Sequence, residues 1–163
     1  MSLQNNYRSN VAVIIVNRAA KVLWCRRKEH DGWQFPQGGI DYGETALEAA
    51  LRETKEEVGL ASHDIEIVYE SQQWFKYEVP KERRVGYFTR KKFLGQKQKW
   101  FLAKLVSEDS KIDLNASRPV EFDKWMWANY WHPLDSVVTF KKETYRQAML
   151  TMLPEYNKLT KKL

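Results

Sequence analysis

The sequence predicts an α+β fold in which strands and helices pack in layers. Three observations support this prediction: an apolar run at Val11–Val16, a helical spacing of apolar residues from Thr45 to Val58, and a similar spacing near the C-terminus. The chain has 163 residues, a length typical of one domain, and no repeat or linker divides it. We therefore expect one domain over residues 1–163, with a short flexible N-terminus and a C-terminal tail.

In the first third of the chain, Val11–Val16 is predicted to be a buried strand and Lys21–Arg27 its neighbour. Gln37-Gly38-Gly39 is expected to break regular structure. The helix over Thr45–Val58 should end at Gly59, because glycine suits a left-handed C-cap. Its expected core stripe, with Ala49 beneath the neighbouring acidic face, consists of Leu47, Ala50, Leu51, Thr54 and Val58.

Further strands are predicted at Ile65–Ser71 and Gln98–Val106. Another is predicted at Trp125–Trp131 and should be closed off by Pro133. The C-terminal segment predicts an amphipathic helix that packs on the body, because apolar residues recur at spacings of three and four. These residues are Tyr145, Ala148, Met149, Met152, Leu153, Tyr156 and Leu159.

The composition excludes several classes of protein. Hydrophobic residues make up 43% and the mean hydropathy is −0.65, which argues against a disordered, collagen-like or membrane-spanning chain. The single cysteine, Cys25, cannot form an intrachain disulfide and fits a reducing compartment. The first residues do not resemble a secretion signal. We expect a cytoplasmic protein without a membrane partner, and the pattern leaves its oligomeric state open.

The positive charge is concentrated in one segment. The net charge is +6, and nine of the 27 Lys and Arg residues lie between Lys76 and Lys99, beside only two acids. Seven aromatic residues lie within or next to this basic segment. A charge run is often only a solvated loop. The alternative is a surface for a polyanion, because Lys and Arg bind phosphates and aromatic rings stack on bases.

Three glutamates share a face of the predicted helix beside the core stripe. Glu53, Glu56 and Glu57 fall within about 100° of one another at 100° per residue. Like charges at this spacing are unfavourable on an exposed helix, so a cation is expected nearby. Oxygen ligands without neighbouring His or Cys favour Mg²⁺, with Mn²⁺ as a substitute. Taken alone, these acids are equally compatible with a solvated acidic face.

The surrounding residues resemble the Nudix box. Its pattern is Gly, five residues, Glu, seven residues, Arg-Glu, an aliphatic residue, one residue, Glu-Glu, one residue, Gly and an aliphatic residue. The sequence reads GGIDYGETALEAALRETKEEVGL from Gly38, and the only departure is Thr54 at an aliphatic position. Segments from Tyr7 to Leu153, among them WQFPQGG and GQKQKWF, resemble the bacterial RNA pyrophosphohydrolase and dinucleoside polyphosphate hydrolase branch.

This resemblance implies a Nudix-like α/β/α sandwich, with a mixed β-sheet between helices, that hydrolyses phosphoanhydride bonds with Mg²⁺. It implies metal binding by Gly38, Glu53, Glu56, Glu57 and Glu121. Arg52 would orient a glutamate, and Glu44 would support the site or anchor the loop. The general base is left open among Glu53, Glu56 and Glu121.

The resemblance also implies a set of substrate-binding residues. Arg8, Arg27 and Lys141 would contact phosphates or the first nucleotides, and Val138 and Phe140 would form a platform for a base. Gln96, Lys97 and Lys99 could line the substrate channel, and strand alternation places the two lysines on one face.

The leading functional hypothesis is an enzyme that removes pyrophosphate from the 5′-triphosphate end of RNA and so initiates mRNA decay. The alternative is a dinucleoside polyphosphate hydrolase, and the basic segment favours the longer polyanion. Two weaker hypotheses are a catalytically silent RNA-binding module, against which the intact acids argue, and a hydrolase of oxidised mononucleotides. His30, His63 and His132 lack metal-ligand spacing, so no role is expected for them.

Overall fold

A computed structural model describes residues 6–30 and 32–163. The predicted flexible N-terminus falls mainly on residues 1–5, which lie outside the described residues. The strands and helices follow the order β1 (Tyr7–Val16), β2 (Val22–Arg27), β3 (Trp33–Gln34), β4 (Gln37–Gly39), α1 (Ala46–Val58), β5 (Ile65–Glu70), β6 (Phe75–Glu78), α2 (Tyr87–Lys91), β7 (Gly95–Leu105), β8 (Phe122–Ala128), α3 (Pro133–Ser136) and α4 (Thr139–Thr160). Short 3₁₀ turns occur at Lys81–Arg83 and Asp109–Lys111.

The described strands form one mixed sheet in the order β3-β2-β1-β7-β5. β1 and β7 run parallel over ten paired residues, from Tyr7 beside Gly95 to Val16 beside Lys104. The other pairings are antiparallel: β4 joins β1, β6 joins β7 and β8 joins β2. Every residue of the Val11–Val16 run is buried, because helices cover both faces of the central strands.

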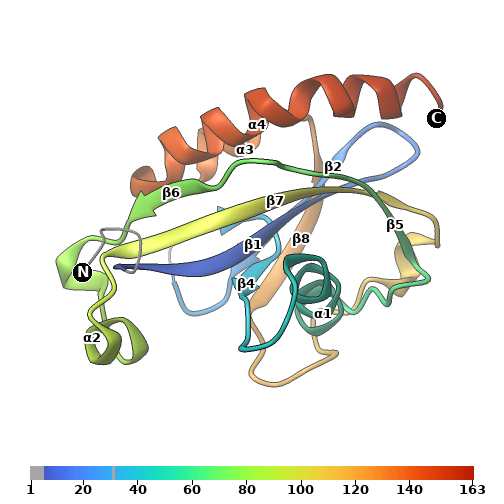
Figure 1. Cartoon of the computed structure of the whole chain (residues 1–163). Helices are drawn as coiled ribbons and strands as arrows, with labels where there is room; N and C mark the ends of the chain where they lie inside the picture. The colour runs from blue at the N-terminus through green and yellow to red at the C-terminus, as the bar shows by residue number, and fades with distance from the viewer. Residues whose placement is uncertain (1–5, 31) are drawn as a thin grey trace.

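Two hydrophobic layers lie on opposite faces of the sheet (Figure 1). Alternate residues of β1 point to opposite sides, so Ile14 packs under α4 and Ile15 packs under α1. Phe35, Trp100 and Tyr145 meet in the α4 layer, where the rings of Phe35 and Tyr145 stack at 5.6 Å. The predicted α+β arrangement, with a mixed sheet between helices, is confirmed.

Several details differ from the sequence-based predictions, among them the start of β7, which is Gly95 and not Gln98. Gln37-Gly38-Gly39 is a strand, not a break, because its backbone pairs with β1. The β8 strand begins at Phe122 and ends at Ala128, and Pro133 starts α3. The helix α4 begins at Thr139, six residues before the predicted apolar pattern. On α1, Leu47 is 42% exposed instead of belonging to the core, whereas Ala49 is buried.

No helix in the described part of the chain is both long enough and apolar enough to span a membrane.

Candidate active site

The helix α1 presents its carboxylates to the end of the sheet where β4 joins β1. Thr45 caps the N-terminus by accepting a hydrogen bond from the backbone N–H of Glu48 at 3.1 Å. Gly59 ends the helix with φ +75°, and its backbone N–H donates to the Lys55 carbonyl. Thr54 is fully buried and its hydroxyl donates to the Ala50 carbonyl at 2.7 Å, so this position of the box is accommodated within the core.

Arg52 connects the acidic residues of this site. Its guanidinium donates to Glu44 at 2.7 and 2.9 Å, to Glu53 at 2.8 Å and to Glu56 at 3.3 Å. It also donates to the Gly39 carbonyl at 2.8 Å, which ties α1 to β4. These contacts raise the pKa of Arg52, and the same guanidinium lowers the pKa of Glu44. Arg52 therefore fixes carboxylates and stays charged, as an orienting residue should.

Glu57 is the most deeply placed carboxylate of the site. Its residue is 5% exposed, and its Oε2 atom has no hydrogen-bond partner. Burial raises the pKa of Glu57 well above its usual range, and the charges of Glu53 and Glu121 raise it further. Burial also raises the pKa of Glu53, against the opposing effect of Arg52. A buried acceptor without a donor indicates that a cation or proton belongs beside it.

Because Gly38 has no side chain, the Glu53 carboxylate fits directly beside it. A Cβ atom at position 38 would lie 2.0 Å from the Cδ of Glu53. The neighbouring Gly39 makes room for Arg8, whose Nη2 would lie 2.2 Å from a Cβ there. The two glycines therefore bring the strand backbone against both an acidic and a basic side chain.

The donor set fits a hard divalent cation. Among the described residues, no three acidic, His or Cys side chains are already gathered as a ligand cluster, and Arg52 neutralises Glu53 and Glu56 through ion pairs. The unpartnered Glu57 oxygen and the raised pKa values of Glu53 and Glu57 are nevertheless the features that a cation would relieve. All the side-chain donors are oxygens, which favours Mg²⁺ or Mn²⁺ over Zn²⁺.

A cavity of about 730 Å³ extends from these carboxylates to a basic and aromatic end. Glu53, Glu57 and Glu121 line it, and the same three acids line a second cavity of about 480 Å³ that also reaches Glu56. The first cavity is large enough for a nucleotide with its phosphates. Six further residues that the sequence predicted at the site also line this cavity: Arg8, Arg27, Gly38, Gln96, Phe140 and Lys141.

The basic end contains a buried amine. Lys141 is 4% exposed, and its Nζ donates to Gln34 Oε1 at 3.0 Å and lies 5.4 Å from the centre of the Tyr77 ring. Burial, and to a smaller extent the charge of Arg27, lower the pKa of Lys141 to about 7. The pKa of Arg27 is also lowered, chiefly by burial. An anion that enters this end would favour the charged form of Lys141.

Three predicted substrate-binding residues do not line the cavity. Val138 lies in the turn before α4. Lys97 and Lys99 alternate with Gln96 along β7 and face the opposite side of the strand. Their Nζ atoms lie 5.1 and 5.4 Å from the ring centre of Trp74.

Several lining residues were not predicted as site residues. The lining also includes Glu82, Arg83, Val85 and Phe88, which come from the arm between β6 and β7 that contains α2. This arm therefore forms one wall of the cavity. Arg83 lies 5.6 Å from the ring centre of Phe140. The basic segment was a signal for this wall, but charge alone did not separate Arg83 from its exposed neighbours. His30, to which no role was assigned, also lies on the lining.

The chain is similar to known proteins over most of its length. The family model described as NUDIX domain matches residues 6–156. An RNA pyrophosphohydrolase from Mannheimia succiniciproducens is 47% identical over 89% of this chain and 73% of its own length. An RNA pyrophosphohydrolase from Francisella tularensis subsp. mediasiatica is 46% identical over 94% of this chain and 97% of its own length.

Solved structures support the same fold. The Escherichia coli dihydroneopterin triphosphate pyrophosphohydrolase has a TM-score of 0.67 at 21% identity, over 88% of this chain and 97% of that one. A Caenorhabditis elegans Ap4A hydrolase has a TM-score of 0.60 at 19% identity, over 89% of this chain and 98% of that one.

Proposed function

The chain belongs to the Nudix family, and from that premise we propose that it is an RNA pyrophosphohydrolase that acts on the 5′-triphosphate end of RNA. Water adds to phosphorus, one phosphoanhydride bond breaks, and the products are 5′-monophosphate RNA and pyrophosphate. This reaction would expose the transcript to decay in the cytoplasm. The near full-length similarity to relatives of that name supports the substrate class.

The observation that carries this proposal is the cavity that joins the carboxylates of Glu53, Glu57 and Glu121 to a basic, aromatic end. A 5′-triphosphate would lie toward Glu53, Glu57 and Glu121, and the first nucleotide would lie toward Phe140. Arg8, Arg27 and Lys141 would contact phosphates or the first nucleotides from the cavity lining. Phe140 is half-buried, so part of its ring is available for a base.

Mg²⁺, or Mn²⁺ in its place, would be held by the Gly38 carbonyl, Glu53, Glu56, Glu57 and Glu121. When bound, such an ion neutralises polyphosphate charge and lowers the pKa of water. Arg52 would keep Glu53 and Glu44 in position throughout. Of the three candidate bases, Glu53 and Glu121 line both cavities, whereas Glu56 lines only the smaller one and its side chain is 46% exposed. This geometry favours Glu53 or Glu121 as the proton acceptor.

The test compares a triphosphorylated RNA of a few nucleotides with a diadenosine polyphosphate, each in Mg²⁺ and in EDTA. We expect preferential release of pyrophosphate from the RNA. Glu57→Gln should lower kcat at least about a thousandfold by analogy with the loss of other essential catalytic groups. The matched control is Glu48→Gln, an exposed acid on the same helix, which should leave kcat within twofold.

The competing outcomes are distinct. Preference for the diadenosine polyphosphate would retain the family chemistry but make the chain a dinucleoside polyphosphate hydrolase. Binding of RNA without hydrolysis of either substrate would indicate a silent binding module.

A further inference from the structure

A second surface of basic and aromatic side chains lies on the other side of β7 from the cavity. Side chains alternate along a strand, so Gln96 lines the cavity while Lys97 and Lys99 face away from it. Lys76 on β6 is paired with Lys97 in the sheet register. We define the lysine–tryptophan face as Tyr7, Trp74, Lys76, Lys97 and Lys99.

Trp74 is held in place by the two lysines of β7. The Nζ of Lys99 donates to the carbonyls of Ser71 at 3.0 Å and Gln72 at 2.6 Å, which fixes the loop before β6. The Nζ atoms of Lys97 and Lys99 lie 5.1 and 5.4 Å from the Trp74 ring centre. Trp74 remains 38% exposed, so the ring is oriented and still accessible.

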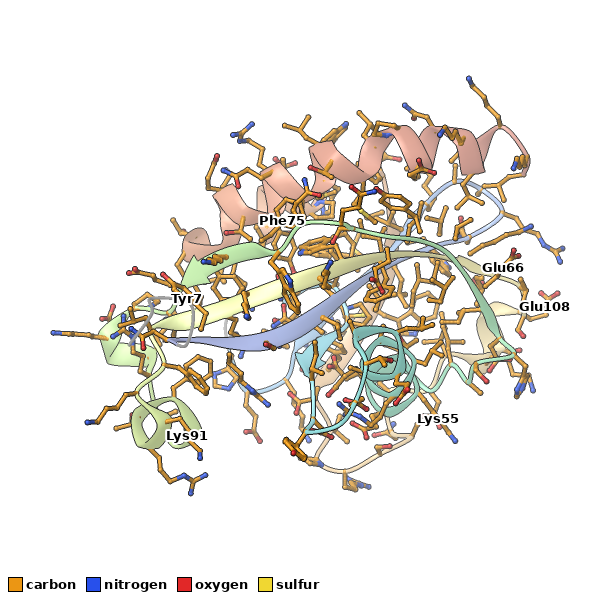
Figure 2. All side chains as sticks on the ribbon, in the orientation of Figure 1. Tyr7, Lys55, Glu66, Phe75, Lys91 and Glu108 are labelled. Atoms are coloured by element: carbon orange, nitrogen blue, oxygen red, sulfur yellow. The ribbon has the colours of Figure 1, made fainter. Side chains whose placement is uncertain are left out.

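The same arrangement recurs at the start of β1. The Nζ of Lys76 lies 5.2 Å from the centre of the Tyr7 ring, and the Tyr7 hydroxyl donates to Glu78 Oε1 at 3.3 Å. Figure 2 shows Tyr7 at the end of the sheet farthest from the C-terminus. Two aromatic rings, each beside an ammonium group, therefore lie across three adjacent strands.

The charge of this face is available to a ligand. None of its three lysines forms an ion pair with an acid in the described part of the chain. Lys76 is exposed and Lys97 and Lys99 are half-buried. The helix α4 packs on the opposite face of β6, where the Thr144 hydroxyl donates to the Lys76 carbonyl at 2.6 Å.

We propose that the lysine–tryptophan face binds the RNA downstream of its 5′ end, with phosphates on the lysines and a base on Trp74. This inference rests on the proposed function. An oriented aromatic ring beside ammonium groups that form no ion pair in the described part of the chain matches the alternation of bases and phosphates in a single strand. An acidic peptide would use the lysines but would have no need of the ring, so the observations favour RNA.

The face is also adjacent to the cavity through shared strands. Tyr7 belongs to the face and the next residue, Arg8, lines the cavity. On β7, likewise, Gln96 lines the cavity and the next residue, Lys97, belongs to the face. A strand of RNA that leaves the cavity past the start of β1 would reach the face directly.

The test measures binding by fluorescence anisotropy with a single-stranded 5′-hydroxyl RNA of about twelve nucleotides, which lacks the triphosphate. We expect Trp74→Ala to weaken binding about tenfold and Trp74→Phe to restore most of it, because stacking needs only an aromatic ring. Lys97→Gln should weaken binding about threefold and reduce the salt slope by about 0.7 for one lost phosphate contact.

The matched controls are Trp131→Ala, since Trp131 is 39% exposed, and Lys104→Gln, on the far part of β7. Both should bind the RNA as the wild type does. Binding by Trp74→Ala within twofold of wild type, or an equal loss in Trp131→Ala, would overturn the proposal. Displacement of the RNA by polyglutamate as readily as by unlabelled RNA of equal charge would also overturn it.

Hydrolysis of a triphosphorylated dinucleotide separates this inference from the proposed function. If the wild type cleaves the dinucleotide but Trp74→Ala binds the longer RNA normally, only the lysine–tryptophan face fails. If binding depends on Trp74 but the wild type does not cleave the dinucleotide, the proposed function fails and the face is retained as a binding surface.

Discussion

The carboxylate helix and the basic segment are both dense in charge, but the fold treats them differently. Glu53, Glu56 and Glu57 stay together because one helix carries them, and Arg52 from the same helix binds two of them. The nine basic residues of the segment Lys76–Lys99 are divided among β6, the arm and β7. Arg83 reaches the cavity, whereas Lys97 lies on the other side of the sheet.

This difference has a geometric cause. A helix returns to the same face every three or four residues, so a cluster in sequence remains a cluster in space. A segment that passes through strand, arm and strand changes direction and alternates faces, so its charges are shared between two surfaces. A run of charged residues in the sequence therefore marks a single site when one helix carries it, and not when it passes through strand, arm and strand.

The largest effect should come from filling the space beside the acidic helix. In Gly38→Ala the new Cβ would clash with the Glu53 carboxylate, which is side chain and must move. We expect kcat/KM for the triphosphorylated dinucleotide to fall about a hundredfold, as for other displaced metal ligands or their supports. Steady-state kinetics checks this. The control Gly43→Ala adds a Cβ that meets nothing within 4 Å but strains a backbone with φ +79°, so it should lower stability and leave kcat/KM within twofold. Activity within threefold of wild type would contradict the assigned role of Gly38.

A smaller loss is expected from removing the residue that joins the acids. Arg52→Gln deletes the hydrogen bonds to Glu44, Glu53 and Glu56, so kcat should fall about thirtyfold. Lys55→Gln makes the same charge change on the exposed side of α1 (Figure 2) and should leave kcat within twofold. Equal effects of the two substitutions would mean that net helix charge, not orientation, matters.

The buried amine of the basic end predicts a pH effect on stability. Lys141 has a pKa of about 7 in the folded protein, below the value of about 10.4 for an unfolded chain. Between these values the unfolded chain binds a proton that the folded protein does not, so the free energy of unfolding rises with pH. The contribution is about 1 kcal/mol from pH 7.5 to 8.5.

Urea unfolding at these two pH values checks this prediction. Lys141→Met should remove the rise, and Lys142→Met, on the adjacent exposed position, should keep it. An unchanged rise in Lys141→Met would assign the pH dependence to another group.

The smallest effect concerns the basic segment itself. Arg83 lines the cavity beside Phe140, so Arg83→Gln should lower kcat/KM for the dinucleotide about threefold, through KM. Lys91, on α2 away from the sheet (Figure 2), should tolerate Gln without measurable change. A loss of the same size in both variants would show that the segment acts through its total charge.

Long regular elements could be predicted from the sequence, because periodicity is visible over many residues. The helix predicted over Thr45–Val58 is confirmed as α1 (Ala46–Val58), with Gly59 as its C-cap, and the run Val11–Val16 is buried as predicted. The short strands β3, β4 and β6 span four residues or fewer, too few to show alternation. For this reason Gln37-Gly38-Gly39 was predicted to interrupt regular structure, although backbone pairing with β1 makes it the strand β4.

The candidate site was predictable to the same extent. The residues that match the Nudix box pointed to the carboxylates of α1. The burial of Glu57, however, depends on the sheet beneath it and cannot be derived from helix spacing alone. Alternation correctly placed Lys97 and Lys99 on one side of β7. Which side faces the cavity depends on where α4 and the arm pack, and those are long-range contacts.

The parallel pairing of β1 with β7 also constrains how the protein is made. Val11–Val16 is synthesised well before its partners on β7, which are Lys99–Lys104. On the ribosome, this apolar run must wait until β7 has been synthesised before its central position in the sheet exists. Until then one edge of β1 has no partner strand, although β2 and β4 can pair with the other, and the open edge is available to chaperones or to the same segment of another nascent chain.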